Sequence, residues 1–176
     1  MKSSLNEAIK TRRSIRKYKP NMVEQNKIDQ IIETGLYAAS GMNQQGVKII
    51  AVKNKEFRNK LSAVNAKIMG ITDGKDPFYG ATVILIVLAD KNWFTGIYDG
   101  SLVMGNLMLA AHALGIGSCW IHRAKETFEQ PEYKEWLKSL GIEGDWEGIG
   151  HCILGYVDGE EPKAPPRKAN RVYWVD

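Results

Sequence analysis

The stretch YDGSLVMGNLMLAAHALG, residues 98–115, places apolar residues on nearly every side of the helix that it would form. A helix that is hydrophobic all round is buried, either in a protein core or against another subunit. Gly115 is placed to end this helix, because glycine readily adopts the left-handed conformation found after helix C-termini. Asp99, Asn106 and His112 make the stretch too polar for lipid. We therefore predict a central helix at the core or at a subunit contact.

A buried strand is predicted shortly before this helix. Residues 81–89, ATVILIVLA, form the longest uninterrupted apolar run, and residues 82–89 are typical of a strand covered on both faces. The run is far shorter than the roughly 20 residues that a membrane-spanning helix needs. Further strands are expected at residues 47–52, 116–121 and 148–157.

Helices are expected between these strands. Ser4 and Glu7 form a capping-box pattern, so one helix begins there and runs toward Thr11. Residues 26–39 and 54–70 have helical character, and residues 125–141 form one or two helices with a break at Pro131. The proline-rich tail, residues 159–176, is expected to be an extended arm. Its RVYWV segment, residues 171–175, is β-prone and can add an edge strand to a sheet, including a partner's.

Length and composition limit the classes of protein to which the chain can belong. The chain has 176 residues and 44% hydrophobic residues, which fits a single domain, residues 1–176, with a sizeable core. The formal net charge of +4 is too small to indicate a nucleic-acid-binding protein by itself. Cys119 and Cys152 stand far apart, and residues 1–10 lack the apolar segment of a secretory signal. We therefore expect a cytoplasmic protein.

Positive charge is concentrated near the N-terminus. The segment TRRSIRKYKP, residues 11–20, holds Arg12, Arg13, Arg16 and two lysines around Ser14. Planar guanidinium groups and a hydroxyl are the donors that phosphate oxygens accept. A solvated basic surface is the alternative, since a run of charges often has no ligand.

Four motifs together resemble those of the nitroreductase family. RRSIRKY, residues 12–18, looks like the family's amino-terminal signature, and ASGMNQQGV, residues 39–47, is similar to its second signature, Pro-Ser-Ala-x-Asn-x-Gln-Pro-Trp. NLMLAAHALGIGSCWI, residues 106–121, resembles the family's core helix and the strand after it. GYVDGEEPKAPPRK, residues 155–168, resembles its Pro-rich end. The order and spacing agree along nearly the whole chain.

The resemblance implies a fold, an assembly and a cofactor. The fold would be α+β, a three-layer sandwich with a mainly antiparallel sheet flanked by helices, assembled as an intertwined homodimer. FMN would bind at each subunit boundary, with NADH or NADPH as a transient electron donor. The sequence has no Rossmann fingerprint and no P-loop, so nicotinamide would stack on the flavin rather than occupy a nucleotide cleft.

The same resemblance implies the cofactor-binding residues. The basic segment and an arginine of the tail would hold the phosphate and the ribityl chain. The loop at residues 40–45 would hold the ring of the flavin bound chiefly by the other subunit, although a helix-ending turn is its simpler interpretation. The end of the strand would lie near the reactive edge of the ring, where His122 and Arg123 can tune the flavin. The expected cofactor-binding residues are Arg12, Arg13, Ser14, Arg16, Ser40, Asn43, Gln45, Ile121, His122 and Arg167.

Two features depart from the family pattern. Alanine, glycine and valine at positions 39, 46 and 47 replace the two prolines and the tryptophan of the second signature, so this loop gains mobility and loses an aromatic wall. Larger members also carry a helical insertion, whereas here only DKNWFTGIYD, residues 90–99, separates the buried strand from the core helix. Trp93 and Phe94 would cover the substrate side of the flavin, or pack this loop onto the core.

A zinc site is the competing interpretation of Cys119, His122, His151 and Cys152. Strand alternation would point Cys119 and His122 to opposite faces, and the adjacent His151 and Cys152 as well, so we expect no metal. His112 is expected to be a buried or interface histidine. No residue is assigned as catalytic, because the FMN would itself carry the chemistry.

The expected activity is a ping-pong, two-electron transfer from NAD(P)H to a nitroaromatic or quinone-type acceptor. The same scaffold supports other flavin chemistry, namely reductive dehalogenation, dehydrogenation and flavin breakdown, because a fold does not fix a reaction. A polyanion- or RNA-binding module is a further alternative, but no aromatic RNA-binding pattern accompanies the basic segment. The expected partners are a second copy of the chain and a small-molecule acceptor, without nucleic acid or membrane.

Overall fold

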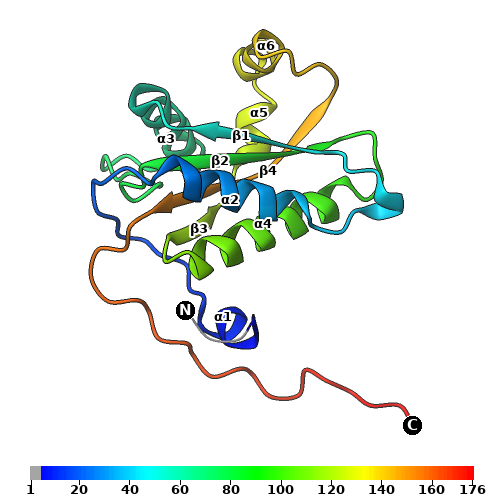
Figure 1. Cartoon of the computed structure of the whole chain (residues 1–176). Helices are drawn as coiled ribbons and strands as arrows, with labels where there is room; N and C mark the ends of the chain where they lie inside the picture. The colour runs from blue at the N-terminus through cyan, green and yellow to red at the C-terminus, as the bar shows by residue number, and fades with distance from the viewer. Residues whose placement is uncertain (1–4) are drawn as a thin grey trace.

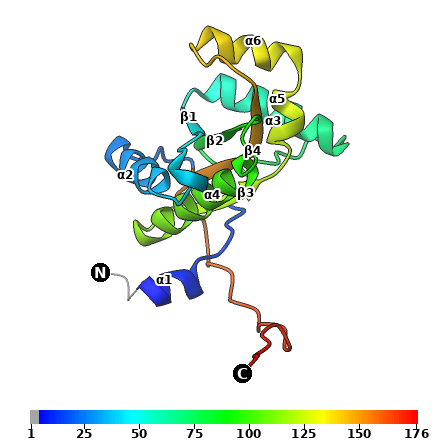
Figure 2. The same cartoon turned by 90° about the vertical axis from the view of Figure 1, so that its right-hand side faces the viewer.

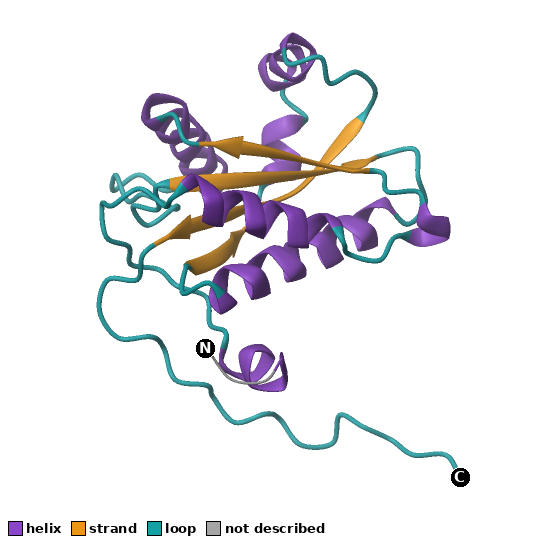
Figure 3. Ribbon diagram, in the orientation of Figure 1, coloured by secondary structure: helices purple, strands orange, loops and turns teal. Residues whose placement is uncertain are grey.

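A four-stranded antiparallel sheet lies between two layers of helices in the computed structural model, which describes residues 5–176 (Figure 1). In the order β1-β2-β4-β3, its strands are β1 (Val47–Val52), β2 (Val83–Asp90), β4 (Trp146–Gly155) and β3 (Gly117–Ile121). One face is covered by α2 (Gln25–Leu36) and α4 (Gly96–Ala113), and the other by α3 (Lys55–Met69), α5 (Ala124–Phe128) and α6 (Pro131–Ser139) (Figures 2 and 3). The predicted α+β sandwich is confirmed.

Strand β2 is the centre of both hydrophobic cores. Ile84, Ile86 and Leu88 are fully buried in the core beneath α3, α5 and α6. The alternate residues Val83, Leu85 and Val87 are fully buried in the core beneath α2 and α4. Because β2 pairs with β1 on one side and β4 on the other, its unbroken apolar run is buried in every direction, as the sequence predicts.

One side of helix α4 packs against the sheet and against α2. Its other side carries apolar residues that are exposed. Met104 and Leu107 are fully buried, whereas Ile97, Tyr98 and Leu102 are more than half exposed. The chain leaves α4 at Gly115, whose φ of 74° is the left-handed conformation predicted for a helix stop. Among residues 5–176, no helix is long and apolar enough to cross a membrane.

Local sequence signals set the helix ends. Helix α3 begins after Asn54, whose side chain caps the first turn, and ends at Gly70 with a φ of 71°. Pro131 is the first residue of α6, so the predicted break is confirmed. The first helix, α1 (Leu5–Thr11), packs against α4. Its predicted cap at Ser4 lies outside the described residues.

The C-terminal tail forms an arm that leaves the body of the protein. Residues 159–176 are exposed and contain neither helix nor strand, and Figure 1 shows them running away from the sheet. Within the chain, the β-prone residues 171–175 pair with no strand among the described residues. Tyr173 and Trp174 are each more than 80% exposed. The extended arm is thus as predicted, while its pairing with a partner, and the intertwined homodimer, stay predictions.

Candidate functional site

The basic segment is held against the first residues of β3. After α1 the chain is extended, Ser14 forms a parallel bridge with Ser118, and Ile15 N donates to Ser118 O at 2.9 Å. Side chains alternate along extended backbone, so buried Ile15 enters the core while Arg12, Ser14 and Arg16 share the other side. All three act on the adjacent Cys119: burial raises the pKa of its thiol, and Arg16, Ser14 and Arg12 oppose that rise.

Arg13 does not share this side of the segment. Its guanidinium donates through Nη2 to Lys10 O, in the last turn of α1, at 2.7 Å and through Nη1 to Arg12 O, just after the helix. Nη1 of Arg12 and Nε of Arg13 are both buried without a hydrogen-bond partner among the described residues. The structure therefore offers Arg12, Ser14 and Arg16 to an anion. Arg13 has only Nε left for a further acceptor while Nη1 and Nη2 donate to the two carbonyls.

The polar loop after α2 has an unusual backbone. It contains the short 3-10 helix η1 (Gly41–Asn43), and Met42, Asn43 and Gln45 have φ values of 51°, 54° and 53°. Gln45 N donates to Ser40 Oγ at 3.0 Å, and Gln45 Nε2 donates to Asn43 Oδ1 at 3.0 Å. The three predicted residues are thus brought together. Asn43 Nδ2 and Gln45 Oε1 remain as a neighbouring donor and acceptor on an exposed loop.

Asp99 fixes this loop to α4. Its side chain, 3% exposed, accepts from Gly41 N and from Thr95 Oγ1, each at 3.0 Å. The approach is close, because a Cβ on Gly41 would lie 2.3 Å from Thr95 Oγ1. Sequence reasoning treated Asp99 only as a polar residue of the helix. Its partner is too distant in the sequence for any spacing pattern to show the contact.

Trp93 and Phe94 lie in the loop between β2 and α4, next to Thr95. Their rings are 4.8 Å apart and tilted by 48°. Phe94 is 74% exposed, whereas Trp93 is half-buried and its Nε1 has no partner within residues 5–176. Trp93 therefore packs the loop onto the protein, and Phe94 is the one available to cover a ligand.

The turn from β3 to α5 is anchored by a buried amide. Asn65 of α3 is fully buried; its Nδ2 donates to His122 O at 2.9 Å, and its Oδ1 accepts from Arg123 Nε at 3.2 Å. Arg123 has a left-handed φ of 73°. Ile121, the last residue of β3, is buried, and the side chain of His122 is exposed. Sequence reasoning missed Asn65, which comes from a different element 57 positions earlier.

The two predicted halves of the site lie at opposite ends of α4. Thr11, at the start of the basic segment, places Oγ1 2.9 Å from His112 Nε2, whereas Gly41 binds Asp99 in the first turn of the helix. From residue 99 to residue 112 the helix rises about 20 Å, at about 1.5 Å per residue. Figure 1 shows α1 and the loop before β1 at these two ends. A single chain therefore does not bring Ser14 and Asn43 together.

The remaining predicted residues are spread over other regions. Arg167 lies in the exposed tail, where its Nη2 donates to Pro165 O at 2.7 Å. Cys119 and Cys152 lie in the two different cores, on opposite faces of the sheet. No group of three or more His, Cys, Asp or Glu side chains gathers in the described part of the chain.

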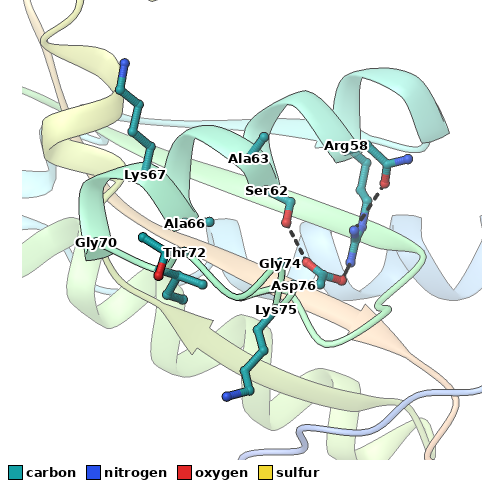
Figure 4. A pocket seen from close by; sticks show the side chains of 12 residues that line it. Arg58, Ser62, Ala63, Ala66, Lys67, Gly70, Thr72, Gly74, Lys75 and Asp76 are labelled. Atoms are coloured by element: carbon teal, nitrogen blue, oxygen red, sulfur yellow. Dashed lines mark hydrogen bonds and ion pairs between the residues drawn. The ribbon is translucent and has the colours of Figure 1, made fainter.

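A pocket lies away from these residues, between α3 and the loop that follows it. Its volume is about 560 Å³, and its wall includes Lys67, Lys75 and a polar cluster shown in Figure 4. In that cluster, Asp76 accepts from Arg58 and Ser62. Burial by itself would raise the pKa of Asp76, but these bonds, with those from the amides of Gly80 and Phe78, lower it below its ordinary value. The cluster thus fixes the loop to α3.

Comparison with known proteins gives a consistent result. The model of the nitroreductase family matches residues 9–156. A Methanothermobacter thermautotrophicus protein, provisionally named NADH dehydrogenase/NAD(P)H nitroreductase, is 34% identical over 121 residues, which are 65% of this chain and 58% of that protein. The FMN reductase (NAD(P)H) of Bacillus subtilis is 29% identical, over 78% of this chain and 66% of that protein. The chain thus spans less than two thirds of the length of either relative.

A solved structure matches the whole fold. The crystal structure of a nitroreductase with bound FMN from Bacteroides fragilis has a TM-score of 0.89 and 29% sequence identity to this chain. The match covers 99% of this chain and 100% of that one. The sheet and both helical layers are therefore those of that structure.

Proposed function

Because the chain belongs to the nitroreductase family, we propose that it is an FMN-dependent oxidoreductase that transfers two electrons from NAD(P)H to a nitroaromatic or quinone-type acceptor. One observation supports the proposal: a set of side-chain donors suited to a phosphate and a pair of side-chain amides suited to a flavin ring lie toward opposite ends of α4, about 20 Å apart along its axis. A cofactor with an anionic end and a flat polar-edged ring would need both groups. We propose that a second copy of the chain brings them together.

The donor set fits the phosphate of FMN. Arg12, Ser14 and Arg16 lie on one side of an extended segment, and Nη1 of Arg12 is buried without a partner among the described residues. A buried guanidinium N–H that lacks an acceptor is costly, and a dianionic phosphate would satisfy it with a charge-assisted hydrogen bond. The same side chains would also fix the position of the ribityl chain.

The loop at residues 40–45 fits the polar edge of the flavin ring. That edge alternates carbonyl oxygens with a ring N–H, so a neighbouring donor and acceptor are complementary to it. Asn43 Nδ2 and Gln45 Oε1 provide such a pair, held by the bond between the two side chains. The anchor at Asp99 keeps the loop in place without a ligand.

When bound, FMN would accept a hydride equivalent from NAD(P)H and pass two electrons to the acceptor. Donor and acceptor would occupy the same face of the ring in turn, which gives ping-pong kinetics. Phe94, exposed beside the anchored loop, would cover that face and exclude water. The chain would therefore supply binding and orientation, and the cofactor the redox chemistry.

An apolar surface supports the proposed homodimer. The exposed side chains concerned come from the end of α2, from η1 and from the beginning of α4, which are joined by the contact between Gly41 and Asp99. Large exposed apolar side chains on neighbouring elements are typical of a protein interface. It is made of Leu36, Tyr37, Met42, Phe94, Ile97, Tyr98 and Leu102. The exposed arm, residues 159–176, would add contacts with the partner.

Cofactor binding tests the proposal directly. The purified protein should bind FMN, quench its fluorescence and oxidise NADH or NADPH when menadione or a nitrofuran is present. Arg16→Gln should weaken FMN binding at least tenfold, since a hydrogen bond to a charged group contributes about 1.5–3 kcal/mol. Lys17→Gln removes the same charge from the next residue, whose side chain pairs with Asp158 at 2.9 Å, and should leave FMN affinity unchanged. A wild-type protein that does not bind FMN would disprove the proposed oxidoreductase function.

A mixed dimer tests the shared site. An Arg16→Gln chain and an Asn43→Ala chain, co-expressed, should form heterodimers in which one site carries both changes and the other carries neither. Random pairing then restores about a quarter of the sites to wild-type FMN affinity. If one chain alone forms the site, every site in the mixture keeps one defect. The two homodimers mixed without subunit exchange are the control.

A further inference from the structure

His112, in the last turn of α4, contacts the last residue of α1. Its side chain is buried, and its Nε2 lies 2.9 Å from Oγ1 of Thr11. Of residues 5–11, which form α1, only Ala8 is buried. A helix of this length is too short to be stable by itself in water. The placement of α1 on α4 therefore depends on a small number of contacts, and the contact with His112 is one of them.

The hydroxyl of Thr11 decides the direction of this hydrogen bond. It donates to the carbonyl of Glu7, four residues earlier in α1, at 2.7 Å. A hydroxyl group has one hydrogen, so toward His112 the oxygen of Thr11 can only accept. Nε2 of His112 therefore carries a proton and donates to Thr11 Oγ1. The two bonds form a chain that runs from α4 through the threonine into the last turn of α1.

The basic segment begins at this contact. Arg12 follows directly, and its amide donates to Ala8 O at 3.0 Å, so the backbone of Arg12 continues the last turn of α1. Two residues further on, Ser14 is held by its bridge to Ser118. Ser118 Oγ donates in turn to Met108 O at 3.4 Å, one turn before the histidine of α4. The backbone that carries Arg12 is thus fixed on both sides against the last two turns of α4.

We propose that His112 is a positioning residue for the phosphate-binding donor set, and that it acts through Thr11 on Arg12. This inference rests on the proposed function, in which Arg12 contacts the phosphate of FMN. A bond that fixes the end of α1 limits the directions open to the Arg12 guanidinium before a ligand arrives. The phosphate then binds at a smaller cost of ordering that side chain. Riboflavin, which lacks the phosphate, would gain nothing from the bond.

A matched set of variants separates this bond from packing. His112→Phe keeps a ring and removes both nitrogens, whereas His112→Gln keeps an N–H donor. Thr11→Val keeps the shape of an exposed threonine and removes its hydroxyl. Ser139→Ala is the control, because Ser139 is the last residue of α6, on the other face of the sheet, and its hydroxyl donates to Trp136 O at 2.7 Å. The control removes a bond of the same kind from the end of another helix.

The protonated ring nitrogen is the first measurement, made on the cofactor-free protein. The 15N spectrum of the His112 ring near neutral pH should show a proton on Nε2. It should be lost from the spectrum of His112→Phe and keep its shift in Ser139→Ala, whereas Thr11→Val should move it. A ring protonated on Nδ1 alone would overturn the proposal, because Nε2 would then have no hydrogen to donate.

Hydrogen exchange of the Arg12 amide is the second measurement, and it also needs no flavin. His112→Phe and Thr11→Val should each speed this exchange by about tenfold, and the double variant no further, because both changes break one chain of bonds. His112→Gln should restore most of the protection, and Ser139→Ala should match the wild type. Unchanged protection in Thr11→Val would overturn the proposal, even if His112→Phe does not fold.

Affinity for two flavins is the third measurement. Thr11→Val and His112→Phe should each weaken FMN binding by about fivefold and leave riboflavin binding unchanged, since only FMN carries the phosphate. Equal losses for the two flavins, or an unchanged FMN affinity together with faster exchange, would overturn the link to the phosphate. A wild-type protein that binds neither flavin would instead reject the proposed function, and the two measurements on the cofactor-free protein would still decide whether His112 holds α1.

Discussion

Acidification should destabilise the wild-type protein more than a His151→Phe variant. The pKa of His151 is lowered by burial from 6.5 to about 4, so the folded protein keeps this ring neutral while the unfolded chain takes up a proton below about pH 6.5. The unfolded state then binds more protons, and stability falls as the pH drops from 6.5 toward 4. At about 1.4 kcal/mol per pH unit, the loss is about 2 kcal/mol at pH 5 and about 3 kcal/mol at pH 4.

Urea unfolding at pH 7.5 and pH 5 measures this effect. Between the two conditions, the free energy of unfolding of His151→Phe should fall by about 2 kcal/mol less than that of the wild type, because the variant has no group to titrate at this position. Carboxylates such as Asp76 are present in both proteins and cancel in the difference. An identical pH dependence in the two proteins would refute the reasoning, since it would mean that the imidazole is hydrated or protonated in the fold.

Three further substitutions test other contacts. Asp76→Ala should lower the free energy of unfolding at pH 7 by about 1–2 kcal/mol in urea unfolding, because it removes the partner of the buried Arg58 and the anchor of the loop after α3. The folded state lowers the pKa of Asp76, so the wild type should lose this advantage only as the pH falls below about 4. Asp99→Ala should lower the free energy of unfolding by about 1–2 kcal/mol, because the side chain loses its bonds to Gly41 and Thr95. Unlike a surface change, it should also weaken FMN binding in a fluorescence titration, because it frees the loop at residues 40–46. Gly148→Ala should cost more than about 2 kcal/mol in thermal unfolding, because the new methyl group meets the backbone of Ala124, and a variant as stable as the wild type would contradict this packing.

The features that were predicted correctly from the sequence depend on short stretches of neighbouring residues. An apolar run such as residues 82–89 is buried on both faces in any fold that accommodates it, and β2 is so buried. Gly115 and Pro131 end and begin helices because of their own backbone preferences. These features depend on a few neighbouring residues, which is why spacing and composition were sufficient to find them.

The side-chain directions in the basic segment could not be predicted from neighbouring residues alone. The sequence places Arg12, Arg13, Ser14 and Arg16 in one cluster, but which of them face the same way depends on the pairing of Ser14 with Ser118. That pairing turns Arg13 back onto α1 and leaves the other three on one side. Alternation along a strand has a period of two, so the bridge of Ser14 to Ser118 decides the direction of the side chains next to it, and a second bridge, of Tyr18 to Val157, decides that of Tyr18.

The sequence by itself determined the order of the helices and strands, the two-sided burial of β2 and the motifs that resemble the nitroreductase family. Only the tertiary structure showed that Asn65 anchors the β3–α5 turn, that Asp99 anchors the polar loop, and that the basic segment and this loop lie at opposite ends of α4. The physical reason is the range of the interactions. Helix and strand preferences act over a few residues, whereas a hydrogen bond between residues nearly 60 positions apart forms only after the chain has folded back on itself.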